Sequence, residues 1–234
     1  MHVLDGTNPS GSSLNWPRNY NHWRFIVDEG KTISQAVIGR LPRYYRYLGD
    51  LRDANIERIS SSELSGLMKV TASQIRQDFN NFGGFGQQGY GYNVKYLYTE
   101  IGKILGLNDA HRLVIVGAGN LGRALIGYSN YESRGFIFEG IFDQDPDIIG
   151  KEVGELTVRP MNELEDFIIS HKIDIVVIAI PKAGAVEVAE KIVKCGVKAI
   201  WNFAHTDLNV PSDVVVENVH LSDSLMKLSY MLQK

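Results

Sequence analysis

A glycine-rich turn between an apolar run and a helical pattern constrains the fold of this chain more than any other feature. The apolar run at residues 113–116 leads into Gly117, Gly119 and Gly122, spaced as G-x-G-x-x-G, and an amphipathic helical pattern follows. The first glycine of such a turn permits a sharp reversal and the second lets backbone N–H groups approach a pyrophosphate. The third allows the helix to pack closely on the strand. The order strand, glycine turn and helix therefore predicts a dinucleotide-binding turn.

An acidic residue stands at the distance that this turn requires. A second apolar run at 136–142 ends at Asp143, 21 residues after Gly122. A carboxylate there accepts hydrogen bonds from the hydroxyls of an adenosine ribose and repels a 2′-phosphate, which favours NAD over NADP. The alternative is an ordinary turn residue, because Asp143-Gln144-Asp145-Pro146 has the composition of a turn.

The rest of the second half alternates between strand and helix patterns. Strands are predicted at 173–180, 198–202 and 214–219, and helices at 161–171 and 183–195. This alternation indicates an α/β domain of the Rossmann type, with a doubly wound parallel sheet. Ligands on such sheets lie beyond the carboxyl ends of the strands, which adds further cofactor candidates. These are Ile180, Pro181, Lys182, Asn202 and Phe203, although Pro181 alternatively only ends its strand.

The first half carries two short helices in succession. Ser60 with Glu63, and Thr71 with Gln74, have the spacing of capping boxes at helix starts, whereas Pro42 must kink or restart the helical pattern before them. The second of the two helices buries Ala72, Ile75 and Phe79. Its outer face shows Ser73, Gln74, Arg76, Gln77 and Asn80. Gln suits adenine edges and Arg suits guanine, so the pair predicts a helix-turn-helix that reads a major groove. The alternative is the solvated face of an ordinary small helical domain.

A stretch of alternating glycines and aromatic residues follows at 82–92. Glycines permit tight turns and a close backbone approach to phosphates, so this segment predicts the hairpin wing of a winged helix. Residues 31–100 carry nine basic and six acidic side chains, whereas residues 101–234 carry thirteen and eighteen. The imbalance weakly favours contact between the front half and a polyanion.

The first thirty residues and the last helix of the chain have different sequence patterns. Residues 1–30 mix Gly, Ser, Asn and Pro without a period and are expected to be a leader outside the fold, either disordered or added by cloning. The last helix aligns Leu221, Leu225, Leu228 and Leu232 in one stripe, which either packs on its own sheet or is exchanged between subunits.

Composition excludes several classes of protein. The longest apolar runs are too short for a membrane span, and no cluster of His, Cys and carboxylates has the spacing of a metal site. The single cysteine, Cys195, cannot form an intrachain disulfide and is expected to be a packed thiol. These features predict a cytoplasmic protein that needs no metal.

Six segments together resemble the Rex family of bacterial redox-sensing transcriptional repressors. The resemblance covers about residues 33–234, and the segment at 71–94 is the most specific. The segments are LPRYYRYL (41–48), RISSSEL (58–64), TASQIRQDFNNFGGFGQQGYGYNV (71–94), GAGNLGRAL (117–125), GIFD (140–143) and ENVHLSD (217–223).

The resemblance implies a homodimeric repressor that binds inverted-repeat operator DNA and releases it when NADH binds. It divides the chain into a winged-helix domain with its linker helix (31–107), a Rossmann domain that binds NADH and NAD (108–220), and a dimerisation helix inserted into the partner subunit (221–234). It implies cofactor contacts from Gly117, Ala118, Gly119, Asn120, Leu121, Gly122, Tyr128, Asp143, Ile180, Pro181, Asn202 and Phe203. It implies DNA contacts from Arg46, Arg58, Ser73, Gln74, Arg76, Gln77, Asn80, Phe85, Gly86, Gln87, Tyr90 and Tyr92.

Two departures from the family pattern accompany the resemblance. His220 stands where some relatives carry an acidic residue, and His205 stands where proline is common. The competing interpretations are an NAD-dependent dehydrogenase, a CoA-binding domain protein and a DNA-bridging protein with a vestigial Rossmann domain. Against the enzyme, the histidines show no partnered acid/base spacing and no second domain is large enough to hold a substrate.

Overall fold

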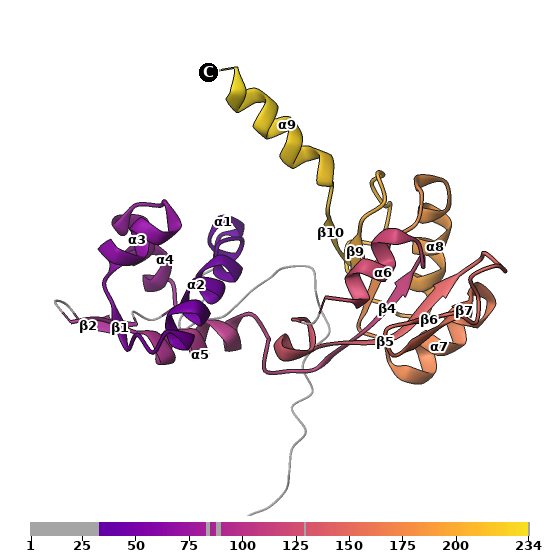
Figure 1. Cartoon of the computed structure of the whole chain (residues 1–234), viewed down its shortest axis with the longest axis horizontal. Helices are drawn as coiled ribbons and strands as arrows, with labels where there is room; N and C mark the ends of the chain where they lie inside the picture. The colour runs from indigo at the N-terminus through magenta and orange to yellow at the C-terminus, as the bar shows by residue number, and fades with distance from the viewer. Residues whose placement is uncertain (1–32, 83–84, 88–89, 129, 234) are drawn as a thin grey trace, which may run out of the picture.

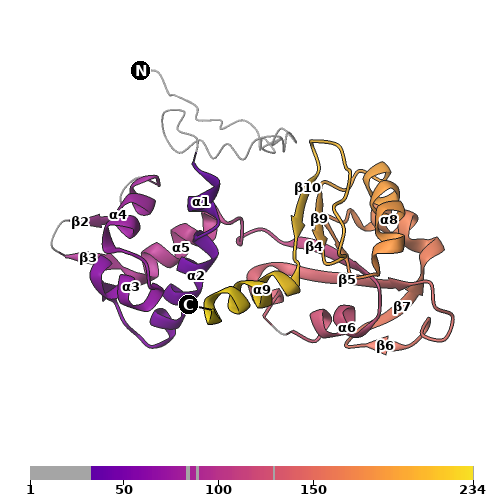
Figure 2. The same cartoon turned by 90° about the horizontal axis from the view of Figure 1, so that it is seen from above.

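A computed structural model describes residues 33–82, 85–87, 90–128 and 130–233. The predicted leader at 1–30 and parts of the predicted wing lie outside these residues. Figures 1 and 2 show two lobes, one built mainly of helices and the other around a sheet, with the chain passing between them after α5. The larger sheet and the recognition helix predicted from the sequence therefore lie in different lobes.

Over residues 33–82, 85–87 and 90–104, the first lobe contains five helices and a small antiparallel sheet. The helices are α1 (Gln35–Ile38), α2 (Leu41–Asp53), α3 (Ser61–Met68), α4 (Ala72–Asn80) and α5 (Val94–Ile104). The sheet has the order β1 (Arg58–Ile59), β3 (Gly91–Asn93) and β2 (Gly86–Gln87). Pro42 lies in the first turn of α2, so the helical pattern restarts there rather than kinking. Helix, helix and hairpin follow in winged-helix order, and their apolar core stays within this lobe.

The two predicted capping boxes differ in the structure. At α3 the box is complete, because the backbone N–H of Glu63 donates to Ser60 Oγ and the Glu63 carboxylate accepts from the backbone of Ser60. At α4 only half of it forms: the backbone N–H of Gln74 donates to Thr71 Oγ1 over 3.1 Å. The Gln74 amide instead bonds to Asp78, so the second box is corrected to a single cap.

The second lobe is a seven-stranded sheet in the order β10-β9-β8-β4-β5-β7-β6, parallel except for the β6–β7 pair. Its strands are β4 (His111–Val116), β5 (Phe136–Asp143), β6 (Glu152–Val153), β7 (Leu156–Pro160), β8 (Ile175–Ile178), β9 (Ala199–Asn202) and β10 (Val215–Asn218). Its helices are α6 (Asn120–Ile126), α7 (Leu164–His171), α8 (Lys182–Lys194) and the short 3₁₀ turns η1 (Glu132–Arg134) and η2 (Met161–Glu163).

Successive residues of the central strand β4 enter different cores. Val114 and Val116 belong to one buried cluster, and Leu113 and Ile115 belong to another. Because both faces of the sheet are covered, the strand reads as an uninterrupted apolar run, as a parallel sheet requires. The predicted doubly wound sheet is therefore confirmed, with an added antiparallel edge at β6 that the sequence did not indicate.

The last helix, α9 (Leu221–Leu232), extends away from its own sheet (Figures 1 and 2). It contains no buried residue, and Leu225, Leu228 and Leu232 are 68%, 56% and 87% exposed. The alternative in which this helix packs on its own sheet is therefore not what the structure shows. Among the described residues, no helix combines the length and apolarity needed to cross a membrane.

Candidate nucleotide-binding site and nucleic-acid interface

The three glycines of the turn differ in what surrounds them. Gly117 has a φ of 108°, and a Cβ there would lie 2.5 Å from the carbonyl oxygen of Ala179. A Cβ on Gly122 would lie 1.9 Å from the carbonyl oxygen of Gly117, whereas one on Gly119 would meet nothing within 4 Å. The first and third glycines are thus needed by the turn itself, and the second leaves the approach to the start of α6 open.

Asp143, at the end of β5, stabilises this turn through hydrogen bonds. Its Oδ2 accepts the backbone N–H of Ala118 over 2.7 Å, and its Oδ1 accepts that of Asp145 over 3.0 Å. The residue therefore closes a local turn, as the alternative interpretation expected, and also holds the glycine loop. A carboxylate has about four lone-pair sites, so acceptor capacity for ribose hydroxyls remains.

The other predicted cofactor residues are arranged unevenly around this loop. Asn120 and Leu121 lie in the first turn of α6, and Ala118 is buried beneath it. Ile180 follows β8 and packs against Gly117, and the exposed Pro181 caps α8 alongside the exposed Lys182. Phe203 follows β9 and lies against the ring of Trp201 at 4.7 Å.

Asn202 takes a different role from the one predicted. Its side chain is fully buried, its amide N–H groups donate to Thr206 O and Asn218 Oδ1, and its oxygen accepts from Ala204 N. These bonds hold the loop that follows β9 to β10. The side chain therefore positions that loop, and its predicted contact with the cofactor stays a prediction.

Tyr128 belongs to an aromatic group beside the sheet. Its ring is 51% exposed and lies 5.0 Å from that of Tyr131, which in turn packs edge-on against Phe138 and Trp201. Burial, and then the proximity of Tyr128, raises the pKa of Tyr131. Tyr131 and Trp201 were missed from the sequence because nothing in their spacing relates them to the glycine turn.

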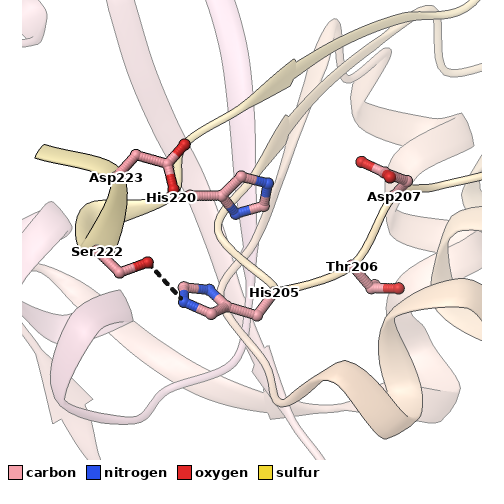
Figure 3. Close-up of a pocket in the computed structure, with 6 residues that line it drawn as sticks. All are labelled: His205, Thr206, Asp207, His220, Ser222 and Asp223. Atoms are coloured by element: carbon pink, nitrogen blue, oxygen red, sulfur yellow. Dashed lines mark hydrogen bonds between the residues drawn. The ribbon is translucent and has the colours of Figure 1, made fainter. Parts of the chain in front are cut away.

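The two histidines noted as departures lie together where β10 passes into α9 (Figure 3). Their ring centroids are 5.3 Å apart, and Ser222 Oγ lies 3.3 Å from His205 Nε2. They line a pocket of about 240 Å³ with Thr206, Asp207, Ser222 and Asp223. Nδ1 of His220 is buried without a hydrogen-bond partner in the part of the chain that the structure describes. The contact between these two rings could not be predicted, because the two histidines are 15 positions apart in the chain.

The outer face of α4 is the candidate surface for base contacts. Ser73, Arg76, Gln77 and Asn80 are exposed, as predicted. Arg76 Nη1 donates to Ser61 Oγ over 3.0 Å, which bends its guanidinium toward α3. Gln74 is half-buried and donates one of its two amide N–H groups to Asp78, and its contact with a base stays a prediction.

Replacing Arg76 with Ala separates base reading from phosphate contact. If Arg76 reads a guanine, R76A should cost about 1–3 kcal/mol of operator affinity and relax base choice at one position. The measurement is the dissociation constant for a series of singly substituted duplexes, with Ser61→Ala as a control for the intramolecular bond. A uniform loss on every duplex would make Arg76 a phosphate contact instead.

Asp78 is a buried acidic residue of α4 that could not be singled out from the sequence. It is fully buried and accepts four hydrogen bonds, two from Arg40, one from Tyr44 and one from Gln74. Burial opposes its ionisation, but the bonds from Arg40, Tyr44 and Gln74 outweigh burial and lower its pKa. A buried ionised carboxylate on the predicted recognition helix therefore ties that helix to α2.

The residues of the predicted wing and its surroundings divide into buried and exposed sets. Tyr90 is exposed, and Arg58 Nη1 donates to its carbonyl oxygen over 3.3 Å. Tyr92 is buried edge-on against Phe79, and the half-buried Phe85 packs on the same ring. The DNA contacts predicted for these two residues stay predictions. Gly86 and Gln87 form β2. Arg46 is exposed on α2, with its guanidinium 5.6 Å from the ring centre of Tyr47.

Neither the single thiol nor the acidic side chains suggest further chemistry. Burial raises the pKa of Cys195, which suits a packed thiol rather than a reactive one. Within the described ranges, no group of three or more His, Cys, Asp or Glu side chains is placed to hold a metal ion.

Two family models match the chain. One, described as "Putative DNA-binding protein N-terminus", matches residues 32–80, and the other, described as "CoA binding domain", matches residues 108–206. The first falls on the winged-helix lobe and the second on the sheet of the other lobe. They agree with the fold but do not name a ligand for the chain as a whole.

Relatives that align along most of the chain are repressors. The redox-sensing transcriptional repressor Rex of Clostridioides difficile (strain 630) is 57% identical over 204 residues, which cover 87% of this chain and 97% of that protein. The Rex protein of Clostridium novyi (strain NT) is 52% identical over 206 residues, covering 88% and 98%. Both are named repressors and not enzymes, which confirms the prediction of a non-enzymatic protein.

Two crystal structures of a repressor called RSP superpose on this chain. The structure of RSP with β-NAD⁺ and operator DNA has a TM-score of 0.82 and 54% identity, covering 86% of this chain and 93% of RSP. The structure of RSP with β-NADH has a TM-score of 0.80 and 51% identity, covering 86% and 95%. With identity above one half along most of both partners, and with the fold shared, this chain belongs to the Rex family of redox-sensing transcriptional repressors.

Proposed function

We propose that this repressor binds an inverted-repeat operator as a homodimer and releases it when NADH replaces NAD⁺ in the sheet-containing lobe. The observation that carries the proposal is the pairing, in one chain, of an exposed α4 face with an open glycine turn. RSP, which shares this fold, has been crystallised with NAD⁺ and operator DNA and also with NADH. That RSP binds both NAD⁺ and operator DNA supports the assignment of these two ligands to this chain.

The proposal assigns a task to each segment. Residues 31–107 contact DNA through Ser73, Arg76, Gln77 and Asn80, with Arg46, Arg58, Gly86, Gln87 and Tyr90 beside the backbone. Residues 108–220 hold the cofactor through the loop from Gly117 to Gly122, with Tyr128, Asp143, Ile180, Pro181 and Phe203. Residues 221–234 join two copies. The site of action is the cytoplasm, where operator DNA and the nicotinamide pool meet.

The residues around the turn fit a nicotinamide dinucleotide. The Asp143 carboxylate accepts ribose hydroxyls and disfavours a 2′-phosphate, and the open space at Gly119 admits a pyrophosphate to backbone N–H groups. The proposal assigns the nicotinamide end to Ile180, Phe203 and Tyr128, whose side chains are apolar or aromatic. Such side chains disfavour the positive charge of an oxidised nicotinamide ring, because a desolvated charge without a counter-ion is costly.

Differential affinity is the only means by which a cofactor can shift this repressor between two states. A 100-fold preference for NADH in the released state supplies about 2.7 kcal/mol per site. Two sites in a dimer supply about twice that, which is enough to change the occupancy of a tight operator.

The deciding experiment is a titration of cofactor against a labelled operator, using the duplex that the purified chain selects from a randomised inverted-repeat library. NADH should weaken the complex by roughly two orders of magnitude or more, in line with that energy, whereas NAD⁺ should not. Fluorescence anisotropy measures the effect. Equal responses to NADH and NAD⁺ would remove the redox-sensing function.

Coenzyme A serves as the control ligand, since one family model that matches residues 108–206 is described by it. We expect no release by CoA, because the proposal assigns Asp143 to an unphosphorylated ribose. Release by CoA alone would favour the CoA-binding alternative.

A further inference from the structure

The buried carboxylate of Asp78 holds the recognition helix through groups from another helix. Its Oδ2 accepts from Arg40 Nε over 2.6 Å and from the Tyr44 hydroxyl over 2.8 Å. Its Oδ1 accepts from Arg40 Nη2 over 2.7 Å and from Gln74 Nε2 over 2.8 Å. Arg40 therefore binds the Asp78 carboxylate in a bidentate manner, which fixes the orientation of the carboxylate as well as its distance from the guanidinium.

The network joins segments that are remote in sequence. Arg40 immediately precedes α2 and Tyr44 lies within it, whereas Asp78 belongs to α4. Tyr44 is fully buried and its ring lies 4.9 Å from that of Phe79, the next residue after Asp78. Apolar contacts alone permit small rotations of a nine-residue helix, but a forked ion pair beside them selects one rotation about the helix axis.

The network also orients the amide of Gln74. One of its two amide N–H groups donates to Asp78, which lies one turn further along the same helix. The second N–H and the amide oxygen are not used by this bond, and these are the two groups that a bidentate contact with adenine needs. The directions of Gln74 and of the exposed Ser73, Arg76, Gln77 and Asn80 therefore depend on the rotation of α4.

We propose that Asp78 is a positioning residue for sequence discrimination: it contacts no DNA, but through Arg40, Tyr44 and Gln74 it sets the angle at which α4 presents its outer face. The proposal rests on the proposed operator binding. A positioning role differs from a general stabilising role in its effect on DNA binding. A wrong angle of α4 would remove contacts with the bases, whereas contacts with the DNA backbone depend less on that angle.

The test uses Asp78→Asn in the full chain, which keeps the size of the side chain and removes its charge. Affinity is measured for the selected operator and for a scrambled duplex of equal length. We expect the ratio of the two affinities to fall by about tenfold or more, since a single lost base contact has an effect of that order. Affinities for the scrambled duplex and for NADH should stay within about twofold of those of the wild type. Binding to the scrambled duplex should persist because non-specific binding is electrostatic.

Two further variants test the proposal if Asp78→Asn folds poorly. Arg40→Lys retains the charge but loses the fork, and should also reduce the ratio. Gln74→Ala removes one of the four hydrogen bonds to Asp78 and should also reduce the ratio. Equal losses on both duplexes for Asp78→Asn and Arg40→Lys would overturn the proposal.

The controls separate this proposal from the function on which it rests. If the wild-type chain itself shows no preference for its selected operator over the scrambled duplex, operator binding fails and the variants are uninformative about function. If the wild type discriminates and the Asp78→Asn ratio equals that of the wild type, only the positioning role of Asp78 fails.

Discussion

Replacing Gly122 with alanine should abolish NADH binding and destabilise the sheet-containing lobe. The added Cβ would lie 1.9 Å from the carbonyl oxygen of Gly117 and 3.3 Å from Ile115 Cγ2 on β4. The closer neighbour is backbone, not the end of a flexible side chain, so α6 must move away from the strand. Overpacking of this kind costs about 1–3 kcal/mol and sometimes more, and we expect the upper end here.

Gly119→Ala is the informative companion to this variant. Its Cβ would meet nothing within 4 Å, and its φ of −69° suits any residue. We therefore expect a normal stability but weakened NADH binding, since the methyl group occupies the space through which a pyrophosphate would approach. Gly66→Ala on α3 also meets nothing within 4 Å and serves as a control for the fold and for NADH binding.

Calorimetry and NADH fluorescence together distinguish the two effects. Gly122→Ala should lower the melting temperature of the sheet-containing lobe, whereas Gly119→Ala and Gly66→Ala should not lower it. Normal NADH affinity in Gly119→Ala would show that the cofactor does not bind over this turn, and a stable Gly122→Ala would show that the helix and strand are less tightly packed than the structure indicates.

What could be predicted from the sequence was local. The glycine turn and its flanking strand and helix involve neighbours in the chain, and the Ser60–Glu63 box spans only four residues. The strands β4 and β8 could also be predicted from their apolar runs, because a strand that is buried on both faces shows no alternation of apolar and polar residues. The β6–β7 hairpin was missed because its strands are short, with Glu152 and Thr157 on the exposed positions of the pair.

The interactions that could not be predicted join distant residues. Arg40 and Asp78 are 38 positions apart. Asp78 follows Ile75 by three residues and so falls on the buried face of α4, but nothing in the helical pattern identifies Arg40 as its partner. Asp78 also accepts a hydrogen bond from the Gln74 amide, for which the spacing had predicted a capping box with Thr71. The same limit applies to Asn202 and Asn218, and to His205 and His220, which meet only because β9 and β10 are neighbours.

Introducing charge into the apolar stripe of α9 should convert the proposed dimer into monomers. Leu221, Leu225, Leu228 and Leu232 follow one face of a helix that buries none of its residues in its own subunit. Exposed stripes of this kind mark interaction sites, and a helix at the end of the chain suits exchange with a second copy. The test is the double variant Leu225→Asp with Leu228→Asp.

The expected loss of dimer stability is large because each substitution occurs in both subunits of a symmetric dimer. Fully burying one leucine contributes about 1.5–3 kcal/mol, so two leucines on each of two helices account for about 6–12 kcal/mol of dimer stability. Losing that much turns a nanomolar dimer into a monomer at micromolar concentration. A monomer reaches only one half-site, so operator affinity should fall by about 10²–10⁴-fold through lost bivalency.

Sedimentation equilibrium measures the dimer, and anisotropy with full and half operators measures the consequence. Lys227→Asp is the matched control, because it places an acidic residue on the other side of the same helix. NADH binding to the monomeric variant reports whether the sheet-containing lobe remains folded. A double variant that stays dimeric while the control behaves like the wild type would show that two copies do not meet through this stripe, and would move the dimer contact to another surface.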